Sequence, residues 1–133
     1  MKPLNEREQA FLRQAAEFCR SHVDPVCEQW EKEEFLPREI FTQAGNLGLM
    51  GMTLSPELGG QGLSFVVYAQ VIIELAQHYA ALALDIATHN SLCIGHILAF
   101  GSEAQIQRCV PRLARGEWRC GLRWCSDASP TAR

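Results

Sequence analysis

The chain has 133 residues, a length that fits one globular domain with a core of its own. Hydrophobic residues make up 47% of the sequence and charged residues 20%, which excludes extensive disorder. The formal net charge is -3, and basic residues alternate with acidic ones, as in Glu31-Lys32-Glu33-Glu34. A nucleic-acid groove needs clustered cations, so we expect no nucleic acid as a partner.

The N-terminal segment and the most apolar stretch bear on targeting and membranes. Residues 1–8 carry acids early and have no apolar segment, unlike secretory signals and transit peptides, so a cytoplasmic location is expected. Polar residues such as Gln70, Asp85 and Asn90 interrupt the apolar stretch 64–100. Because a membrane-spanning helix needs about 20 predominantly apolar residues, we expect a buried helix there and no membrane span.

Six cysteines stand at positions 19, 27, 93, 109, 120 and 125, with irregular spacing and no Cys-x-x-Cys pair. This spacing argues against a zinc site, and the lack of a secretory signal argues against a disulfide framework. We interpret the cysteines as reduced thiols that pack as small hydrophobic groups.

Helical periodicity organises the first half of the chain. Asn5 and Glu8 form a capping-box pattern, and the apolar residues after them recur at three- and four-residue steps, which predicts a helix over 6–23. An Asp-Pro pair predicts a second helix over 24–34. A third, short helix is expected over 38–45, where glycines end it.

The second half begins with a loop, since residues 51–62 contain a proline and several glycines. Residues 64–100 have helical propensity throughout, and compactness predicts a break between 79 and 84. A second capping box, Ser-x-x-Gln, starts at Ser102 and predicts a last helix, which Pro111 should kink or end.

No segment shows the alternation of a strand. The fold class expected is therefore all-α, an up-and-down-like helical bundle of about five or six helices joined by short loops. Residues 1–117 form the expected helical domain, and residues 118–133 form an irregular tail.

Three segments in register resemble the N-terminal domain of acyl-CoA dehydrogenases, and the early Pro37-Arg38-Glu39-Ile40-Phe41 also fits. Their order and spacing match the family across residues 4–117. The three segments are Leu47-Gly48-Leu49-Met50-Gly51 leading into Pro56-Glu57-Leu58-Gly59-Gly60-Gln61-Gly62, then His89-Asn90-Ser91-Leu92, then Phe100-Gly101-Ser102-Glu103-Ala104-Gln105 followed by Val110-Pro111-Arg112-Leu113-Ala114-Arg115-Gly116-Glu117.

This resemblance implies an enzyme with a helical domain, a central β domain and a C-terminal helical bundle. Such enzymes use FAD to oxidise an acyl-CoA thioester: a base removes the α proton while the flavin takes a hydride from the β carbon. The family's base is a glutamate, usually in the C-terminal bundle, and the flavin is held mainly by the β domain and a neighbouring subunit. The resemblance therefore implies an acyl-CoA substrate and a homo-oligomer, and it assigns this chain no catalytic residue and no activity of its own.

The tail departs from the family pattern. The family continues into a strand and a Thr-Glu-Pro-x-x-Gly-Ser-Asp loop near the flavin, whereas this chain continues with residues 118–125 and then Ser126-Asp127-Ala128. We interpret the Ser-Asp pair as what is left of that loop, which makes Ser126 the expected cofactor-binding residue. A truncated or frame-disrupted product is the hypothesis for this change of pattern.

Four residues are candidates for the substrate site. Asp85, His89 and Leu92 share a helical face by their four- and three-residue spacing, as do Thr88 and Leu92. In the family this region lines the inner end of the acyl pocket, so the resemblance gives all four the role of a wall that sets chain length or shape. The alternative is a core helix in which Asp85 and His89 pair.

Other chemistry has weaker support in the sequence. The Asp85–His89 pair fits half of a metal site, but a di-metal bundle needs Glu-x-x-His on facing helices, and the chain has no such motif, so no metal site is predicted. The glycines of 59–62 follow no strand and lack the Lys of a phosphate loop, so they predict a tight turn. The alternative function is a free-standing helical interaction module without catalytic activity, since a domain without its neighbours exposes apolar surface.

Overall fold

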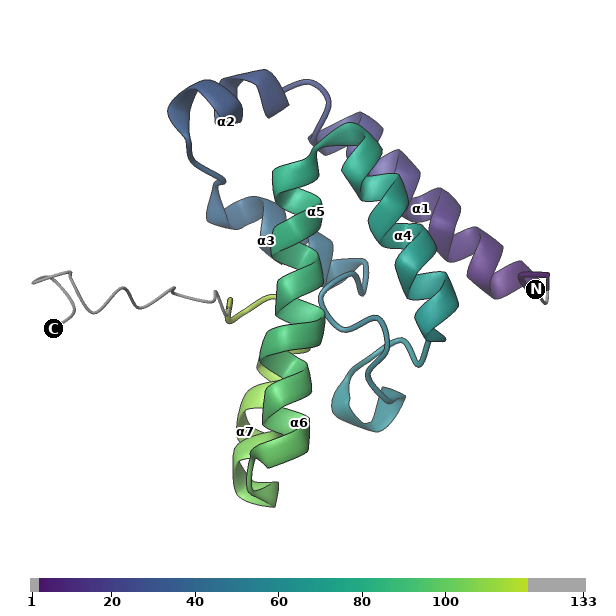
Figure 1. Ribbon diagram of the computed structural model, residues 1–133, viewed down its shortest axis with the longest axis vertical. Helices are drawn as coiled ribbons and strands as arrows, with labels where there is room; N and C mark the ends of the chain where they lie inside the picture. The colour runs from purple at the N-terminus through teal and green to yellow at the C-terminus, as the bar shows by residue number, and fades with distance from the viewer. Residues whose placement is uncertain (1–2, 120–133) are drawn as a thin grey trace, which may run out of the picture.

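The computed structural model describes residues 3–119, and each regular element in that range is helical, which confirms the all-α class (Figure 1). Helices α5, η2 and α6 follow one another without a break, so the described chain forms six helical bodies apart from one short 3-10 turn, in agreement with the expected five or six. The elements are α1 (Glu6–His22), α2 (Cys27–Glu33), α3 (Arg38–Asn46), the 3-10 turn η1 (Pro56–Leu58), α4 (Phe65–His78), α5 (Ala80–Thr88), the π-helical segment η2 (His89–Ile94), α6 (Gly95–Phe100) and α7 (Glu103–Ala114).

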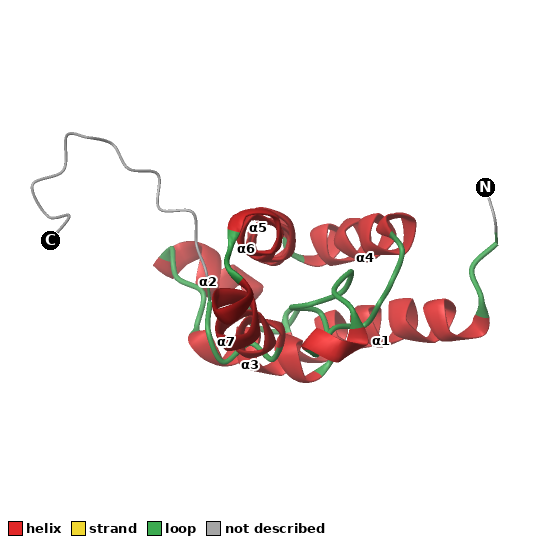
Figure 2. Cartoon of the chain, turned by 90° about the horizontal axis from the view of Figure 1, so that it is seen from below, coloured by secondary structure: helices red, strands yellow, loops and turns green. Residues whose placement is uncertain are grey.

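The helices pack in two layers. Figure 2 shows α4 and the rod formed by α5, η2 and α6 in one layer, with α1, α3 and α7 in the other. The main core fills the space between the two layers. A smaller hydrophobic cluster lies between η2 and α6 of the rod and helix α7. Large fully buried side chains of the main core include Phe41, Leu49, Met50, Met52, Val71, Leu75, Leu82 and Ile86.

Both predicted capping boxes are present. The Asn5 side chain accepts a hydrogen bond from the Glu8 backbone N–H at 2.9 Å, and the Glu8 carboxylate accepts one from the Asn5 N–H. Ser102 and Gln105 make the same reciprocal pair at the start of α7. Each pair satisfies backbone donors that a helix N-terminus leaves without intrahelical partners.

Two of three boundaries differ from the sequence prediction, whereas the break expected between 79 and 84 is present. Helix α2 begins at Cys27, after a turn, and not at the Asp-Pro pair. The expected break is a single extended residue, Tyr79, with φ -153° and ψ 107°. Helix α7 continues through Pro111 to Ala114, although a proline inside a helix costs about 3 kcal/mol. Burial of Val110, Leu113 and Ala114 offsets that cost.

The end of α7 lies close to α3 at two glycines. A Cβ on Gly45 would come within 2.2 Å of the Arg115 carbonyl oxygen, and one on Gly116 within 2.4 Å of the Phe41 carbonyl oxygen. Gly116 also has φ +71°, which glycine adopts without strain. These glycines therefore let two backbones touch and fix α7 against the first half of the chain.

Cys19, Cys27 and Cys109 are free thiols, as expected. The expectation is wrong for Cys93, which is disulfide-bonded, and Cys120 and Cys125 lie outside the described residues. Within 3–119, none of the helices combines the length and the apolarity that a membrane crossing requires.

Candidate functional site

A π-helical segment in the middle of the α5–α6 rod organises the candidate site. Over His89–Ile94 the turn of the helix is wider than in α-helices, so the side chains after Thr88 rotate away from positions that a 3.6-residue period predicts. Segments of this kind occur frequently at functional sites. Nothing in the hydrophobic pattern distinguishes it from ordinary α-helix, and for that reason the sequence did not reveal it.

Asn90, inside this segment, ties the rod to the loop after α3. Its Nδ2 donates to the Leu49 and Ile86 carbonyl oxygens, both at 2.9 Å, and its Oδ1 accepts from the Met52 backbone N–H at 2.9 Å. The side chain is buried, so these bonds form in a medium of low polarity. Sequence analysis gave Asn90 no role, because its partners at 49 and 52 are distant in the chain.

The four candidate wall residues differ in exposure. Asp85 and Thr88 are half-buried and Leu92 is 39% exposed, so these three are accessible on the rod. His89 is fully buried, and its Nε2 lies 3.0 Å from the Leu113 carbonyl oxygen. Because a carbonyl only accepts, this nitrogen carries the proton. The His89 side chain thus contacts α7.

A hollow of about 270 Å³ lies between α4, the rod and the loop before η1. Two of its hydroxyl groups meet at one carbonyl oxygen, that of Ala87, which accepts from Tyr68 Oη at 3.2 Å and from Ser91 Oγ at 2.7 Å. Burial raises the pKa of the Tyr68 hydroxyl, and the Ser91 hydrogen bond opposes that rise, so the phenol stays a neutral donor. The hollow is lined by Thr53, Leu54, Phe65, Tyr68, Asn90, Ser91, Ile94, Gly95 and Leu98.

Asp85 faces a different hollow, of about 350 Å³, between α2 and α5. Glu31 and Glu34 also line it, together with one basic residue, Arg119, so acidic side chains outnumber basic ones there. Tyr79 Oη donates to Glu31 Oε2 at 2.8 Å, and this hydrogen bond raises the Tyr79 pKa. Asp85 and the Tyr68–Ser91 hollow are thus on separate sides of the rod.

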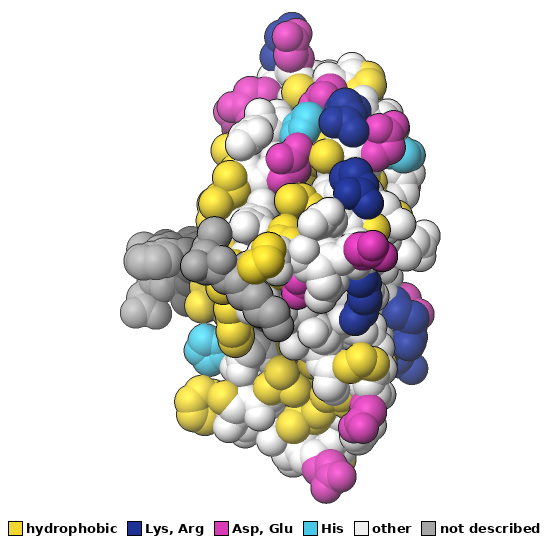
Figure 3. Space-filling model, turned by 90° about the vertical axis from the view of Figure 1, so that its right-hand side faces the viewer, with side chains coloured by type: hydrophobic (Ala, Val, Ile, Leu, Met, Phe, Trp, Pro, Cys, Tyr) yellow, Lys and Arg dark blue, Asp and Glu magenta, His cyan; other side chains and the backbone are white. Residues whose placement is uncertain are grey.

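Hydrophobic side chains are open to solvent around the candidate site. Phe65 is 76% exposed at the start of α4, Leu84 is 64% exposed on the rod, and Phe100 is 84% exposed at the end of α6. Figure 3, which views the side that carries α1 and α4, shows further hydrophobic side chains on the surface, with basic and acidic ones interspersed. Exposed hydrophobic side chains mark an interaction site where they gather into one patch.

Fold and site together define an all-helical domain whose continuous α5–α6 rod leaves Asp85, Thr88 and Leu92 accessible. The sequence model of the acyl-CoA dehydrogenase N-terminal domain matches residues 5–117. The chain therefore belongs to the acyl-CoA dehydrogenase family and contains the N-terminal domain of that family.

Curated relatives and solved structures agree with this assignment. The chain is 33% identical over 117 residues to mitochondrial isovaleryl-CoA dehydrogenase of Bos taurus and 33% identical over 114 residues to human short-chain specific acyl-CoA dehydrogenase. Each alignment covers 86% of this chain and 28% of the relative, so the chain spans under a third of their length.

The fold is similar to that of butyryl-CoA dehydrogenase from Megasphaera elsdenii, with a TM-score of 0.81 and 25% identity over 90% of this chain and 32% of that one. It is also similar to glutaryl-CoA dehydrogenase from Mycobacterium smegmatis in complex with FADH2, with a TM-score of 0.82 and 29% identity over 87% of this chain and 30% of that one.

The described residues do not by themselves fit FAD. The Tyr68–Ser91 hollow is smaller than the roughly 300–1,000 Å³ of usual ligand sites, and its lining contains no Lys or Arg for a diphosphate. A hollow of about 420 Å³ does contain arginines, but Arg38 already donates to the Glu117 carbonyl oxygen and Arg119 lies over the Phe41 ring. Ser126, the predicted cofactor contact, lies outside the described residues.

A metal site finds no support in the described part either. Over residues 3–119, no three His, Cys, Asp or Glu side chains are placed to hold a metal ion. The described residues of the candidate site offer apolar surface and hydroxyl groups.

Proposed function

We propose that this chain is the N-terminal helical part of an FAD-dependent acyl-CoA dehydrogenase, which oxidises an acyl-CoA thioester between its α and β carbons. In this proposal the outer face of the rod, with Asp85, Thr88 and Leu92, forms part of the acyl-pocket wall. The rest of the exposed apolar surface packs against other parts of the enzyme. The observation that carries the proposal is the family match over residues 5–117.

The proposed wall acts through shape and polarity. Leu92 offers an aliphatic contact, while the Thr88 hydroxyl donates to the Asp85 carbonyl oxygen at 3.1 Å and leaves its methyl group available. A wall made of such residues discriminates substrates by the space it leaves, and a misfit of one methylene is worth about 1–3 kcal/mol. His89 stays a predicted wall residue, although its side chain is buried in this chain.

The wall can be tested in a chimaera in which residues 5–117 replace the matching segment of human short-chain specific acyl-CoA dehydrogenase. We expect Thr88→Trp and Leu92→Trp to lower kcat/KM for octanoyl-CoA at least tenfold more than for butyryl-CoA, since a bulky side chain shortens the pocket. Gln77→Trp, on the exposed surface of α4, is the matched control. Equal losses for both substrates, or a shift in the control, would contradict the wall.

The 133-residue chain alone should have no dehydrogenase activity. A base, a flavin and an oriented thioester must be held together for the reaction, and a helical wall supplies none of them. We expect the purified chain to be colourless and to leave butyryl-, octanoyl- and isovaleryl-CoA unoxidised in the presence of an electron acceptor. A yellow, active preparation would refute this part of the proposal.

The second candidate function is a helical interaction module without catalytic activity. It is favoured by the exposure of Phe65, Leu84 and Phe100. Such a module associates with itself or with a related subunit, which light scattering and a pull-down against the human short-chain enzyme would detect. A monomer that binds no such subunit would exclude it.

The absence of a nucleic-acid partner and the cytoplasmic location stay predictions.

A further inference from the structure

A hollow of about 420 Å³ lies between the connection from α2 to α3 and the segment that follows α7. Its volume is within the roughly 300–1,000 Å³ of usual ligand sites. Two arginines and three apolar side chains line this Arg38–Arg119 hollow: Phe35, Leu36, Arg38, Trp118 and Arg119. Positive charge and aromatic surface are therefore brought together from two segments that are far apart in the chain.

The segment after α7 is held in place at this hollow. Arg38 Nη2 donates to the Glu117 carbonyl oxygen at 2.9 Å, and the Trp118 backbone N–H donates to the Arg112 carbonyl oxygen at 3.3 Å. The guanidinium carbon of Arg112 lies 4.9 Å from the centre of the Trp118 ring. The two walls of the hollow are thus positioned before any ligand binds, which lowers the cost of binding.

The guanidinium groups of Arg38 and Arg119 keep donors for a ligand. A guanidinium has five N–H donors, and Arg38 uses one of them in the bond to Glu117. Arg119 lies 4.5 Å from the centre of the Phe41 ring, a contact that is not a hydrogen bond. Within residues 3–119, neither arginine forms an ion pair with a carboxylate. Their charge therefore favours an anion in the hollow.

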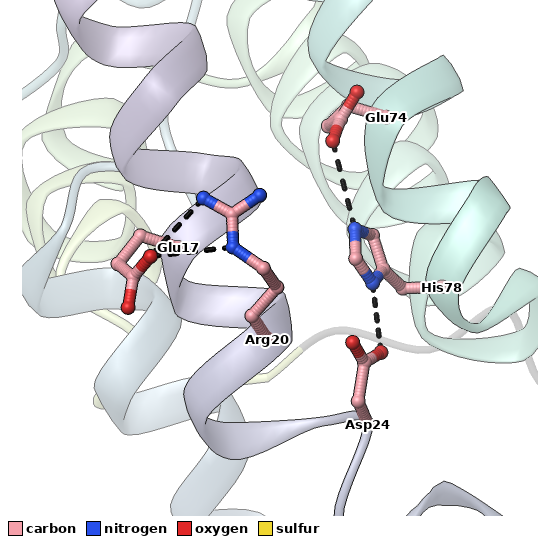
Figure 4. Close-up of polar contacts among 5 residues, drawn as sticks. All are labelled: Glu17, Arg20, Asp24, Glu74 and His78. Carbon is pink, nitrogen blue, oxygen red and sulfur yellow. Dashed lines mark hydrogen bonds and ion pairs between the residues drawn. The ribbon is translucent and has the colours of Figure 1, made fainter.

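Several charged side chains elsewhere in the described chain are paired with one another instead. Arg20 pairs with Glu17 at 3.1 Å, and His78 lies between Asp24 and Glu74 (Figure 4). Contacts of this kind satisfy charges within the chain and leave little to attract a ligand. The two arginines of the hollow differ from these groups in having no acidic partner.

The acidic side chains near the hollow do not take the place of a bound anion. The Glu117 carboxylate accepts from Arg115 at 2.7 Å and does not line the hollow. Glu31 and Glu34 line the hollow between α2 and α5, which Arg119 also borders. Of the two arginines, these acids therefore share a hollow with Arg119 only.

We propose that the Arg38–Arg119 hollow binds a small molecule that carries a phosphate group on an aromatic ring. Planar guanidinium groups donate paired N–H bonds to phosphate oxygens, and two such groups match the several oxygens of one phosphate. The ring contacts the aromatic part of the wall, where Phe35 is 63% exposed and Trp118 is 36% exposed. Neither a free phosphate ion nor an uncharged ring contacts both parts of the hollow.

Titration of the ¹⁵N-labelled 133-residue chain with phenyl phosphate, followed by NMR, tests the site. We expect saturable shifts of amides 35–38 and 118–119 and of the Trp118 indole N–H. The expected Kd is about 1 mM, because the hollow is open to solvent and exposed charge pairs contribute little. Inorganic phosphate and phenol should each bind at least about tenfold more weakly, since each makes only one of the two kinds of contact.

Variants separate the two arginines from general attraction to a cation. Arg38→Gln and Arg119→Gln should each raise the Kd for phenyl phosphate about five- to tenfold, as the loss of one charge-assisted donor group predicts. Arg13→Gln is the matched control, because it removes the same charge from an exposed position on α1, which does not border the hollow. It should change the Kd by less than about twofold.

The titration of the unaltered chain does not depend on any variant folding. No saturable shift up to about 10 mM phenyl phosphate would overturn the proposal. Shifts confined to other segments, equal affinity for inorganic phosphate, or an equal loss of affinity in Arg13→Gln would overturn it as well.

Discussion

Asn90 provides the sharpest test of how the rod is held in place. Its side chain makes three hydrogen bonds to backbone groups, two of them in the loop after α3 and one in α5. Replacing it with alanine removes all three and leaves the partners at Leu49 and Met52 in a buried environment. At about 1 kcal/mol for each bond, with a further penalty for buried groups without partners, the expected cost is about 3–5 kcal/mol.

A loss of that size is a large fraction of the total stability of a small domain, about 5–15 kcal/mol. Urea denaturation followed by circular dichroism measures it directly. Asn46→Ala is the matched control, because Asn46 is exposed at the end of α3, and it should change stability by less than about 0.5 kcal/mol. A cost under about 1 kcal/mol for Asn90→Ala would refute the anchoring role.

Asn90→Asp separates hydrogen bonding from side-chain size. One oxygen of the introduced carboxyl can still accept from the Met52 N–H, but the other takes the place of Nδ2 and faces the Leu49 and Ile86 carbonyl oxygens. Burial and these oxygens disfavour the ionised form, so the folded-state pKa of the introduced carboxyl is raised. Stability should therefore be higher near pH 4 than near pH 7, and should fall as the pH rises above about 4. A variant whose stability relative to wild type does not change with pH would contradict this reasoning.

Three further predictions concern packing, reactivity and capping. Gly45→Ala should destabilise the fold by about 2–3 kcal/mol because its Cβ would meet the backbone of α7, whereas Gly95→Ala, with no neighbour within 4 Å, should stabilise it by about 0.4–1 kcal/mol; thermal unfolding distinguishes the two, and equal effects would contradict the close approach. Cys19, with a thiol pKa raised to about 12, should react with a disulfide reagent at about pH 8 far more slowly than the less buried Cys27, and reaction at equal rates would show that the core opens readily. Ser102→Ala should cost about 1 kcal/mol in denaturant unfolding through loss of the α7 cap, and no change would mean that packing alone holds that helix.

The candidate site was only partly predictable from sequence. The resemblance directed attention to residues 85–92, and three of the four proposed wall residues are accessible there. The fourth, His89, is buried against the Leu113 carbonyl oxygen of α7, a contact between residues 24 positions apart in the chain. Asn90, which fixes the segment in space, has no local signature, since two of its partners lie 38 and 41 residues earlier in the chain.

The sequence by itself determined the helical class, the family and the helix starts at Asn5, Ser64 and Ser102, because a cap is a contact between residues three apart. Only the tertiary structure decided that α7 passes through Pro111, since the burial that offsets the lost hydrogen bond comes from other helices. It also decided which way His89 points and that His78 meets Asp24, 54 residues away. Contacts between residues close in the chain can be predicted from the local sequence. Side-chain direction and long-range pairing depend instead on how the helices pack against one another.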